Sequence, residues 1–179
     1  MSFPASWTVR RARDAYLAEN GFTVEAYDAT WTDGSFLGVR LSVPNTRKHR
    51  WAIMRHDLHH VATGFGTDLV GEAEISAWEI RAAWELGLYV SSIVLGGAVL
   101  GVFRAPLRTI EAFRAGKKVR FLYRGPDSDE EYEAMLNLTV GQLRALMGVP
   151  QDGVARHPAR LHDYAPKEMA HGSHVRPSP

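Results

Sequence analysis

Helical patterns dominate the first 150 positions of the chain. An amphipathic stretch over 7–20 predicts the first helix, and two more helices are expected over 46–63 and 68–86. Each begins beside a serine, threonine or aspartate, whose side chain can accept a hydrogen bond from the free N–H groups of a first helical turn. The first two end before a glycine. We therefore expect a mainly α fold.

Three shorter helices are expected further along the chain. Pro106 suits the first turn of a helix that ends at Ala115. The patterns Ser-x-x-Glu and Thr-x-x-Gln, in which two residues cap the start of a helix reciprocally, place helices over 129–137 and 140–147. The apolar periodicity stops soon afterwards, so residues 1–150 are predicted to form a single helical domain.

Two segments depart from the helical pattern. Residues 22–43 are rich in Val, Thr and aromatic residues, and the Asp-Gly pair at 33–34 favours a tight turn, so we expect a small N-terminal β-hairpin with strands over 22–31 and 36–43. Residues 151–179 contain four prolines and four of the eight histidines. They are predicted to form a loosely ordered C-terminal tail.

The segment 86–103 carries no charged residue over 18 positions, which is close to the shortest length that can span a membrane. Its glycines and serines, and the charged residues that flank it, favour a helix that is buried or lies against a membrane surface. Residues 104–124 then contain seven basic residues and one acidic residue. Peripheral contact of 86–124 with anionic lipids is one interpretation, and a solvated face balanced by the acidic residues that follow is the other.

Composition removes several classes of function. The formal net charge is +1, which gives no reason to expect a nucleic-acid partner. The chain has no cysteine, so disulfides and thiolate chemistry are excluded, and a metal ion would have to be bound by histidine and carboxylate side chains. Acidic residues within the first predicted helix argue against a targeting segment. We expect a cytoplasmic protein, with peripheral attachment to the inner membrane face as an alternative.

Four residues between positions 54 and 79 have the spacing of metal ligands. His56 and His60 are four residues apart, so they lie on one face of a helix, and Asp57 borders that face. The glycine-rich turn at 64–66 reverses the chain, which can bring Glu72 from the next helix of an antiparallel pair opposite His60. Such a shell suits Zn²⁺, and also Fe²⁺ or Mn²⁺. The alternative is a polar cluster without a metal.

Three neighbouring residues are candidates for chemistry outside this shell. His59 can serve as a proton shuttle or as a partner of a ligand, or it can simply be a packing histidine. Glu79 lies two helical turns beyond Glu72 and can hydrogen-bond a ligand, although a solvated glutamate is the default interpretation. Asp68 can likewise hydrogen-bond a ligand, or it can be a solvated side chain. The catalytic residues therefore stay unassigned.

Three classes of metal protein have motifs similar to this one. Zinc peptidases with H-E-x-x-H use the glutamate as general base, and Asp57 takes its place here with a shorter side chain. The phosphohydrolases named after a His-Asp pair need a separate upstream histidine, which His49 matches poorly. The string H-D-x-x-H, eleven residues and then E closely resembles the signature of the fourth Coq protein family of ubiquinone (coenzyme Q) biosynthesis, and the likeness covers about 44–86.

The resemblance implies a mainly helical, bacterial-type relative that binds zinc through His56, Asp57, His60 and Glu72. It further implies a polyprenyl-binding, peripheral membrane protein that takes part in oxidative C1 decarboxylation of a prenylated aromatic acid. The alternative function is a non-catalytic lipid-binding or scaffolding protein with a structural metal. Expected partners are a hydrophobic or prenylated small molecule or lipid, other enzymes of quinone biosynthesis, or a second copy of the chain.

Overall fold

The computed structural model describes residues 2–36, 39–81, 88–124 and 128–156. Within them the fold is mainly helical, as expected. The α-helices are α1 (Val9–Glu19), α2 (Arg47–Thr63), α3 (Leu69–Glu79), α4 (Leu88–Arg104), α5 (Pro106–Ala115), α6 (Asp129–Leu136) and α7 (Val140–Met147). The 3₁₀ turns are η1 (Val24–Asp28), η3 (Gly116–Lys118) and η4 (Leu122–Arg124), and two short strands are β1 (Trp31–Phe36) and β2 (Val39–Pro44).

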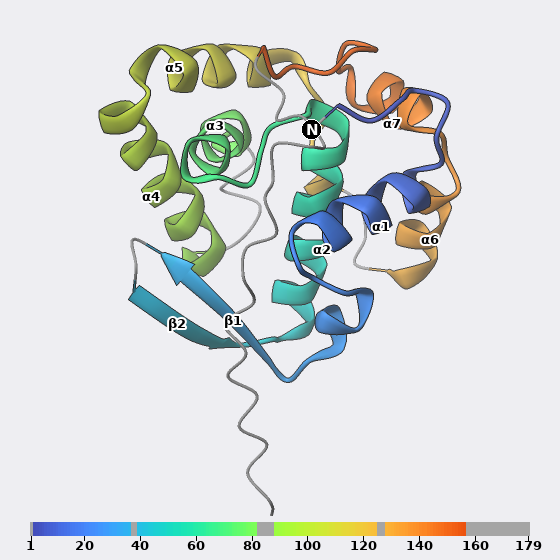
Figure 1. The fold of residues 1–179 in the computed structure, drawn as a ribbon, viewed down its shortest axis with the longest axis horizontal. Coiled ribbons are helices and arrows are strands. Elements are labelled where there is room, and N and C mark those ends of the chain that lie inside the picture. The colour runs from blue at the N-terminus through green and yellow to red at the C-terminus, as the bar shows by residue number, and fades with distance from the viewer. Residues whose placement is uncertain (1, 37–38, 82–87, 125–127, 157–179) are drawn as a thin grey trace, which may run out of the picture.

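Helix α2 runs through the middle of the molecule (Figure 1). On one side it packs against α1 and α7, and α1 also contacts α6. On the other side α3, α4 and α5 pack against one another. The C-terminal half of α2 is consequently buried all round, with Leu58, Val61 and Ala62 at 0% exposure. Because Asp57, His59 and His60 are buried with them, each of those polar side chains needs a partner inside the protein.

The starts of α2, α6 and α7 follow the predicted capping residues, whereas α1 begins at Val9, two residues later than predicted, and is capped by Thr8. Thr46 accepts a hydrogen bond from the His49 N–H, and Ser128 caps α6 in the same way. Thr139 and Gln142 form the reciprocal capping box of α7. Gly64, with φ of 84°, ends α2 in the left-handed conformation that glycine adopts most readily.

The hairpin predicted over 22–43 is wrong in its first strand and in its turn. Half of the first predicted strand is the 3₁₀ turn η1. The Asp-Gly pair lies inside β1, where Asp33 pairs with Ser42 and Gly34 with Leu41. The Asn45 side chain donates hydrogen bonds to the carbonyls of Tyr27 and Ala29, which holds η1 against the start of α2. These tertiary bonds override the local preference for an extended strand.

Helix α3 ends at Glu79, earlier than expected, and residues 82–87 lie outside the described residues. The apolar segment forms α4, a helix of 17 residues. Among the described helices, none combines the length and apolar character needed to cross a membrane. At the start of the predicted tail, Val154 and Ala155 donate N–H groups to the Thr63 carbonyl, so 151–156 is held against the end of α2. The rest of the tail prediction falls on 157–179, outside the described residues.

Candidate metal centre

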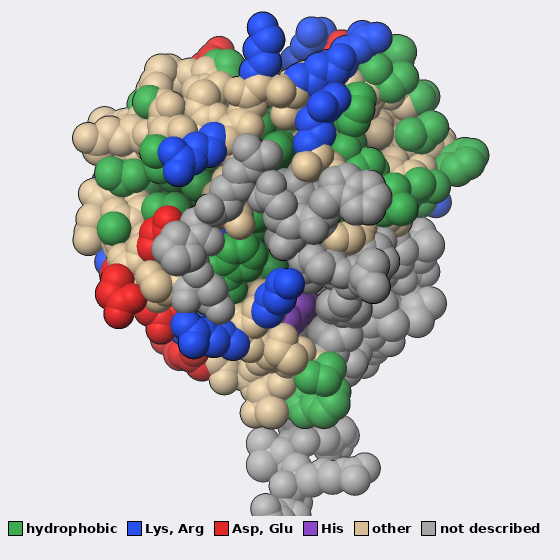
Figure 2. Space-filling view, turned by 180° about the vertical axis from the view of Figure 1, so that it is seen from behind, with side chains coloured by type: hydrophobic (Ala, Val, Ile, Leu, Met, Phe, Trp, Pro, Cys, Tyr) green, Lys and Arg blue, Asp and Glu red, His purple; other side chains and the backbone are tan. Residues whose placement is uncertain are grey.

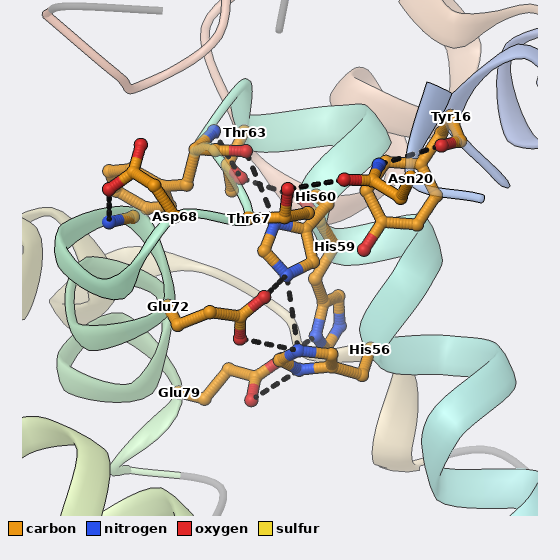
Figure 3. Close-up of polar contacts among 12 residues, drawn as sticks. Tyr16, Asn20, His56, His59, His60, Thr63, Thr67, Asp68, Glu72 and Glu79 are labelled. Atoms are coloured by element: carbon orange, nitrogen blue, oxygen red, sulfur yellow. Dashed lines mark hydrogen bonds and ion pairs between the residues drawn. The ribbon is translucent and has the colours of Figure 1, made fainter. Parts of the chain in front are cut away.

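Three of the four predicted ligands come together between α2 and α3 (Figure 3). One potential ligand atom from each of His56, His60 and Glu72 lies within 4.8 Å of the other two. The two Nε2 atoms are 3.1 Å apart, and the Glu72 carboxylate oxygens lie 3.6 Å from His56 Nε2 and 3.5 Å from His60 Nε2. Ligands about 2.0–2.1 Å from a tetrahedral ion lie roughly 3.3 Å from one another, so the observed spacing suits an ion of zinc's size.

A close approach of two backbones positions Glu72. A Cβ atom added at Gly71 would lie 2.2 Å from the Gly66 carbonyl oxygen, which is far inside van der Waals contact. Glycine at position 71 therefore lets the first turn of α3 rest on the 64–66 turn. Asp68 caps the same helix by accepting hydrogen bonds from the N–H groups of Val70 and Gly71. Asp68 thus has a capping role and is exposed, which accounts for it without any catalytic function.

The other nitrogen of each ligand imidazole is already held by the protein. His60 Nδ1 lies 3.1 Å from the carbonyl oxygen of Phe65, which can only accept, so this nitrogen carries the proton. His56 Nδ1 lies 3.1 Å from both carboxylate oxygens of Glu79 and donates to them. The two Nε2 atoms are therefore directed at one another. This arrangement needs a proton or a metal ion between them, and it is the outer-shell arrangement typical of histidine ligands.

Glu79 is fully buried and accepts hydrogen bonds from three side chains. Besides His56, these are His59, whose Nδ1 lies 2.5 Å away, and the Tyr123 hydroxyl at 3.0 Å. The interpretation of Glu79 as a solvated glutamate is therefore wrong. The sequence placed it on the face of Glu72 but contained no signal that η4 would cover it.

His59 is a packing residue with a fixed tautomer. Its Nε2 accepts the backbone N–H of Leu122 at 3.1 Å, so Nδ1 carries the proton donated to Glu79. The ring is enclosed edge-on by Trp78, Phe121 and Tyr123. With both nitrogens engaged and no exposed surface, His59 is not placed to shuttle protons to a ligand.

The charges of the centre favour a cation. Burial alone would raise the pKa of Glu79, but the adjacent His56 and His59 outweigh it and hold that pKa below its ordinary value. The pKa of Glu72 is lowered in the same way, since His60 and His56 outweigh the effect of burial. Burial lowers the pKa of His60 to about 4, so its ring is neutral near pH 7. Two ionised carboxylates therefore face the pair of imidazoles.

Asp57 lies beside the three converging residues and is not one of them. His56, the preceding residue on the helix, faces Glu79. The Asp57 carboxylate instead accepts a hydrogen bond from the Tyr27 hydroxyl. Burial raises its pKa to about 6, although His56 and Tyr27 act in the opposite direction. Residues one apart on a helix point about 100° away from each other, which explains why Asp57 and His56 meet different partners.

A cavity of about 200 Å³ adjoins the centre. His56, Asp57 and Glu72 line one part of it, and its walls are mainly apolar, with Leu17 and Ile53 among them. Tyr16 also lines it and stacks on the His60 ring with centroids 5.3 Å apart. An apolar cavity of about 150 Å³ can hold a benzene ring, so this one has room for a single substituted ring.

Sequence reasoning missed the tyrosines of this region. Tyr16, Tyr27 and Tyr123 come from α1, η1 and η4, and nothing in their local sequence distinguishes them from ordinary core aromatics. Comparison of the chain with known protein families, with characterised proteins and with solved structures finds no match.

Proposed function

We propose that this protein is a metal-dependent enzyme in which His56, His60 and Glu72 bind a divalent ion, with Zn²⁺ preferred over Fe²⁺ or Mn²⁺. One observation carries the proposal. The two Nε2 atoms face each other at 3.1 Å while both Nδ1 atoms are occupied by protein acceptors. A bound cation would replace the proton that His56, with its raised pKa, otherwise places between the two nitrogens.

Three protein ligands beside a cavity are the arrangement of catalytic zinc sites, which keep one coordination position for water or substrate. The ion would act as a Lewis acid on a carboxylate or phenolate oxygen. Asp57 lines the cavity next to the ligands, and its pKa of about 6 suits a group that exchanges a proton near neutral pH.

For the substrate we propose an aromatic acid, and the mainly apolar cavity supports it. The resemblance of the motif H-D-x-x-H, eleven residues and E adds the reaction, which is oxidative decarboxylation of a prenylated benzoate in quinone biosynthesis. In this reaction the ring carboxyl group leaves as carbon dioxide, a hydroxyl from water takes its place, and two electrons pass to an external oxidant. A long prenyl chain exceeds the cavity and would extend beyond it. The ring alone has the size that the cavity accommodates.

A second candidate function is lipid binding at a membrane, with the metal in a structural role. Helices α4 and α5 expose a set of large apolar side chains, among them Phe103 at 80% and Leu107 at 77% exposure. Figure 2 shows hydrophobic side chains along the edge of the molecule that these helices form, with Lys and Arg side chains at the adjoining edge. An apolar patch next to basic residues suits an anionic lipid surface.

Metal content tests the first proposal. The untagged protein, dialysed against Zn²⁺ and then against metal-free buffer, should retain about one ion per chain by elemental analysis. His60→Ala and Glu72→Gln should lose it, whereas Glu130→Gln, an exposed glutamate on α6, should not. A wild-type protein without retained metal would overturn the proposal.

Two assays then separate enzyme from lipid binder. The zinc-loaded protein is incubated with a prenylated 4-hydroxybenzoate and an oxidant, and release of carbon dioxide is measured for the wild type and for His60→Ala. Sedimentation with phosphatidylglycerol vesicles is compared for the wild type and for Phe103→Ser. Vesicle binding that depends on Phe103, together with no turnover, would favour the second function.

A further inference from the structure

One segment of the chain separates the cavity of the metal centre from solvent. Residues 22–29, which include η1, lie beside α2 (Figure 1). Phe22, Thr23 and Ala26 line the cavity and are also exposed, with Phe22 at 54% exposure. All the other described lining residues are buried or half-buried. The outer wall of the cavity is therefore formed by this segment.

Backbone hydrogen bonds fasten the segment at its two ends. The Phe22 N–H donates to the Leu17 carbonyl, and the Asn45 N–H donates to the Thr30 carbonyl, both at 2.9 Å. Gly21, at the first end, has a φ of 72°, and an added Cβ atom would meet nothing within 4 Å. A glycine in open space can absorb a change of backbone angle, which is what a hinge requires.

A single buried side chain holds the middle of the segment against the protein. Of residues 21–30, all of which the structure describes, only Tyr27 is buried. Its hydroxyl donates a hydrogen bond to the carboxylate of Asp57, which is itself buried and lines the cavity. A hydrogen bond to an ionised carboxylate is among the stronger ones, so this contact acts as a latch.

The other side-chain contacts of the segment lie toward its second end. Asp28 pairs with Arg50 at 3.1 Å, but Asp28 is 70% exposed, and ion pairs of exposed groups contribute little to stability. The Asn45 side chain donates to the carbonyls of Tyr27 and Ala29 at 2.8 and 2.9 Å, which fixes the chain near that end. Lifting the middle of the segment therefore requires breaking the bond between Tyr27 and Asp57.

We infer that residues 22–29 form a lid over the cavity, latched by Tyr27 on Asp57, and that ligands enter when this latch opens. The inference rests on the proposed function only in taking the cavity as the ligand site. It adds the entry route, and it places the latch beside the metal centre, because Asp57 is next to His56 on α2. A closed lid excludes water from the cavity between binding events.

Labelling of a single thiol tests the lid, since the chain has no cysteine of its own. Leu17→Cys places a thiol on the cavity wall, at a side chain that is 3% exposed, and Leu143→Cys places one in the core away from the cavity. In chelator-treated protein, an aromatic disulfide reagent should label Leu17→Cys about tenfold or more faster than Leu143→Cys, because local opening costs less than global unfolding. The rate for Leu17→Cys should also depend less on urea.

Two tyrosine variants then test the latch. Tyr27→Phe should speed the labelling of Leu17→Cys about tenfold, the ratio for losing a hydrogen bond to a buried charged group. Tyr123→Phe is the matched control, because it removes a hydroxyl that donates to Glu79 at 3.0 Å and is not part of the lid, so it should leave this rate unchanged.

Two results of the labelling would overturn the inference. One is an equal rate with equal urea dependence for Leu17→Cys and Leu143→Cys, and the other is an unchanged rate when Tyr27→Phe is added to Leu17→Cys. If Leu17→Cys does not fold, Ile53→Cys takes its place, because Ile53 lines the same cavity from α2.

Ligand kinetics separate this inference from the proposed function. Benzoate should associate about tenfold faster with zinc-loaded Tyr27→Phe than with the zinc-loaded wild type, because the open form is more populated. Equal association rates in stopped-flow measurements would overturn the lid as the entry route. The labelling needs neither metal nor ligand, so a wild type that retains no zinc overturns the proposed function while the labelling still decides the lid.

Discussion

The carboxylate of Glu79 lies 3.1 Å from Nδ1 of His56, and this contact turns the opposite nitrogen of the ring toward His60. Glu79 itself does not reach the point where His56, His60 and Glu72 converge. It determines the tautomer and the direction of one ligand from a completely buried position.

Replacing Glu79 with Gln should weaken metal binding without removing a ligand. The neutral amide attracts the His56 N–H less strongly, and outer-shell changes of this kind cost about 10–100-fold in metal affinity. Competition with a chromophoric chelator measures the change. Glu74→Gln is the matched control, because Glu74 lies on the same helix and pairs with Arg108 at 2.6 Å, away from the centre. An affinity of Glu79→Gln equal to that of the control would contradict the assigned role.

Metal affinity should rise with pH. Burial alone would lower the pKa of His56, but Glu79 and Glu72 outweigh it and raise that pKa well above the ordinary value. At every pH below this raised pKa, a proton on His56 competes with the ion. Metal affinity should therefore rise about tenfold per pH unit, including above pH 6.5, until the pH passes the raised pKa. Calorimetry at pH 7 in buffers of different ionisation enthalpy should show release of about one proton per ion, and His60, with a pKa of about 4, adds none. Binding without proton release at pH 7 would be inconsistent with this expectation.

Replacing Asp57 with Asn should stabilise the metal-free protein at neutral pH. The pKa of Asp57 is raised by burial from 3.8 to about 6, so the ionised form is disfavoured by folding. Below pH 3.8 the carboxyl group of Asp57 therefore does not lower the free energy of unfolding. The loss grows as the pH rises and, above pH 6, reaches on the order of 1–3 kcal/mol. Asparagine keeps an acceptor for the Tyr27 hydroxyl without the charge.

Urea unfolding of chelator-treated protein at pH 4 and pH 7.5 measures this difference. The gain in free energy of unfolding for Asp57→Asn should appear at pH 7.5 and be nearly absent at pH 4. Asp28→Asn, in which the replaced carboxylate is exposed, serves as the control and should show no such dependence. A gain of the same size at both pH values would mean that the charge of Asp57 is not the cause.

Replacing Gly71 with Ala should weaken the metal centre by moving α3. The added Cβ would meet the Gly66 carbonyl at 2.2 Å, so the two backbones must separate and Glu72 must withdraw from His60. We expect loss of metal affinity together with lower thermal stability. Gly21→Ala is a useful contrast, because the same atom there meets nothing within 4 Å, although its φ of 72° makes it strained. Full metal affinity in Gly71→Ala would show that Glu72 does not depend on this contact.

Local sequence was enough to predict the helices and the ligand pair. Hydrogen bonds four residues apart define an α-helix, so the i, i+4 spacing of His56 and His60 places both rings on one face wherever the helix packs. Capping by Thr46, Thr139 and Ser128 is also decided within a few residues. The return of Glu72 toward His60 followed from the short glycine-rich turn.

Tertiary structure alone decided which polar residues complete the centre. Asp57 turned to Tyr27, and Glu79 was enclosed by His59 and Tyr123, through contacts 20 to 44 residues apart in the chain. Other tertiary contacts, the hydrogen bonds of the Asn45 side chain to the carbonyls of Tyr27 and Ala29, hold η1 where part of the strand at 22–31 was predicted. Burial requires a partner for every buried polar group, and which partner is available depends on how distant segments pack. The sequence by itself determined the two histidines on α2, and packing determined what orients them.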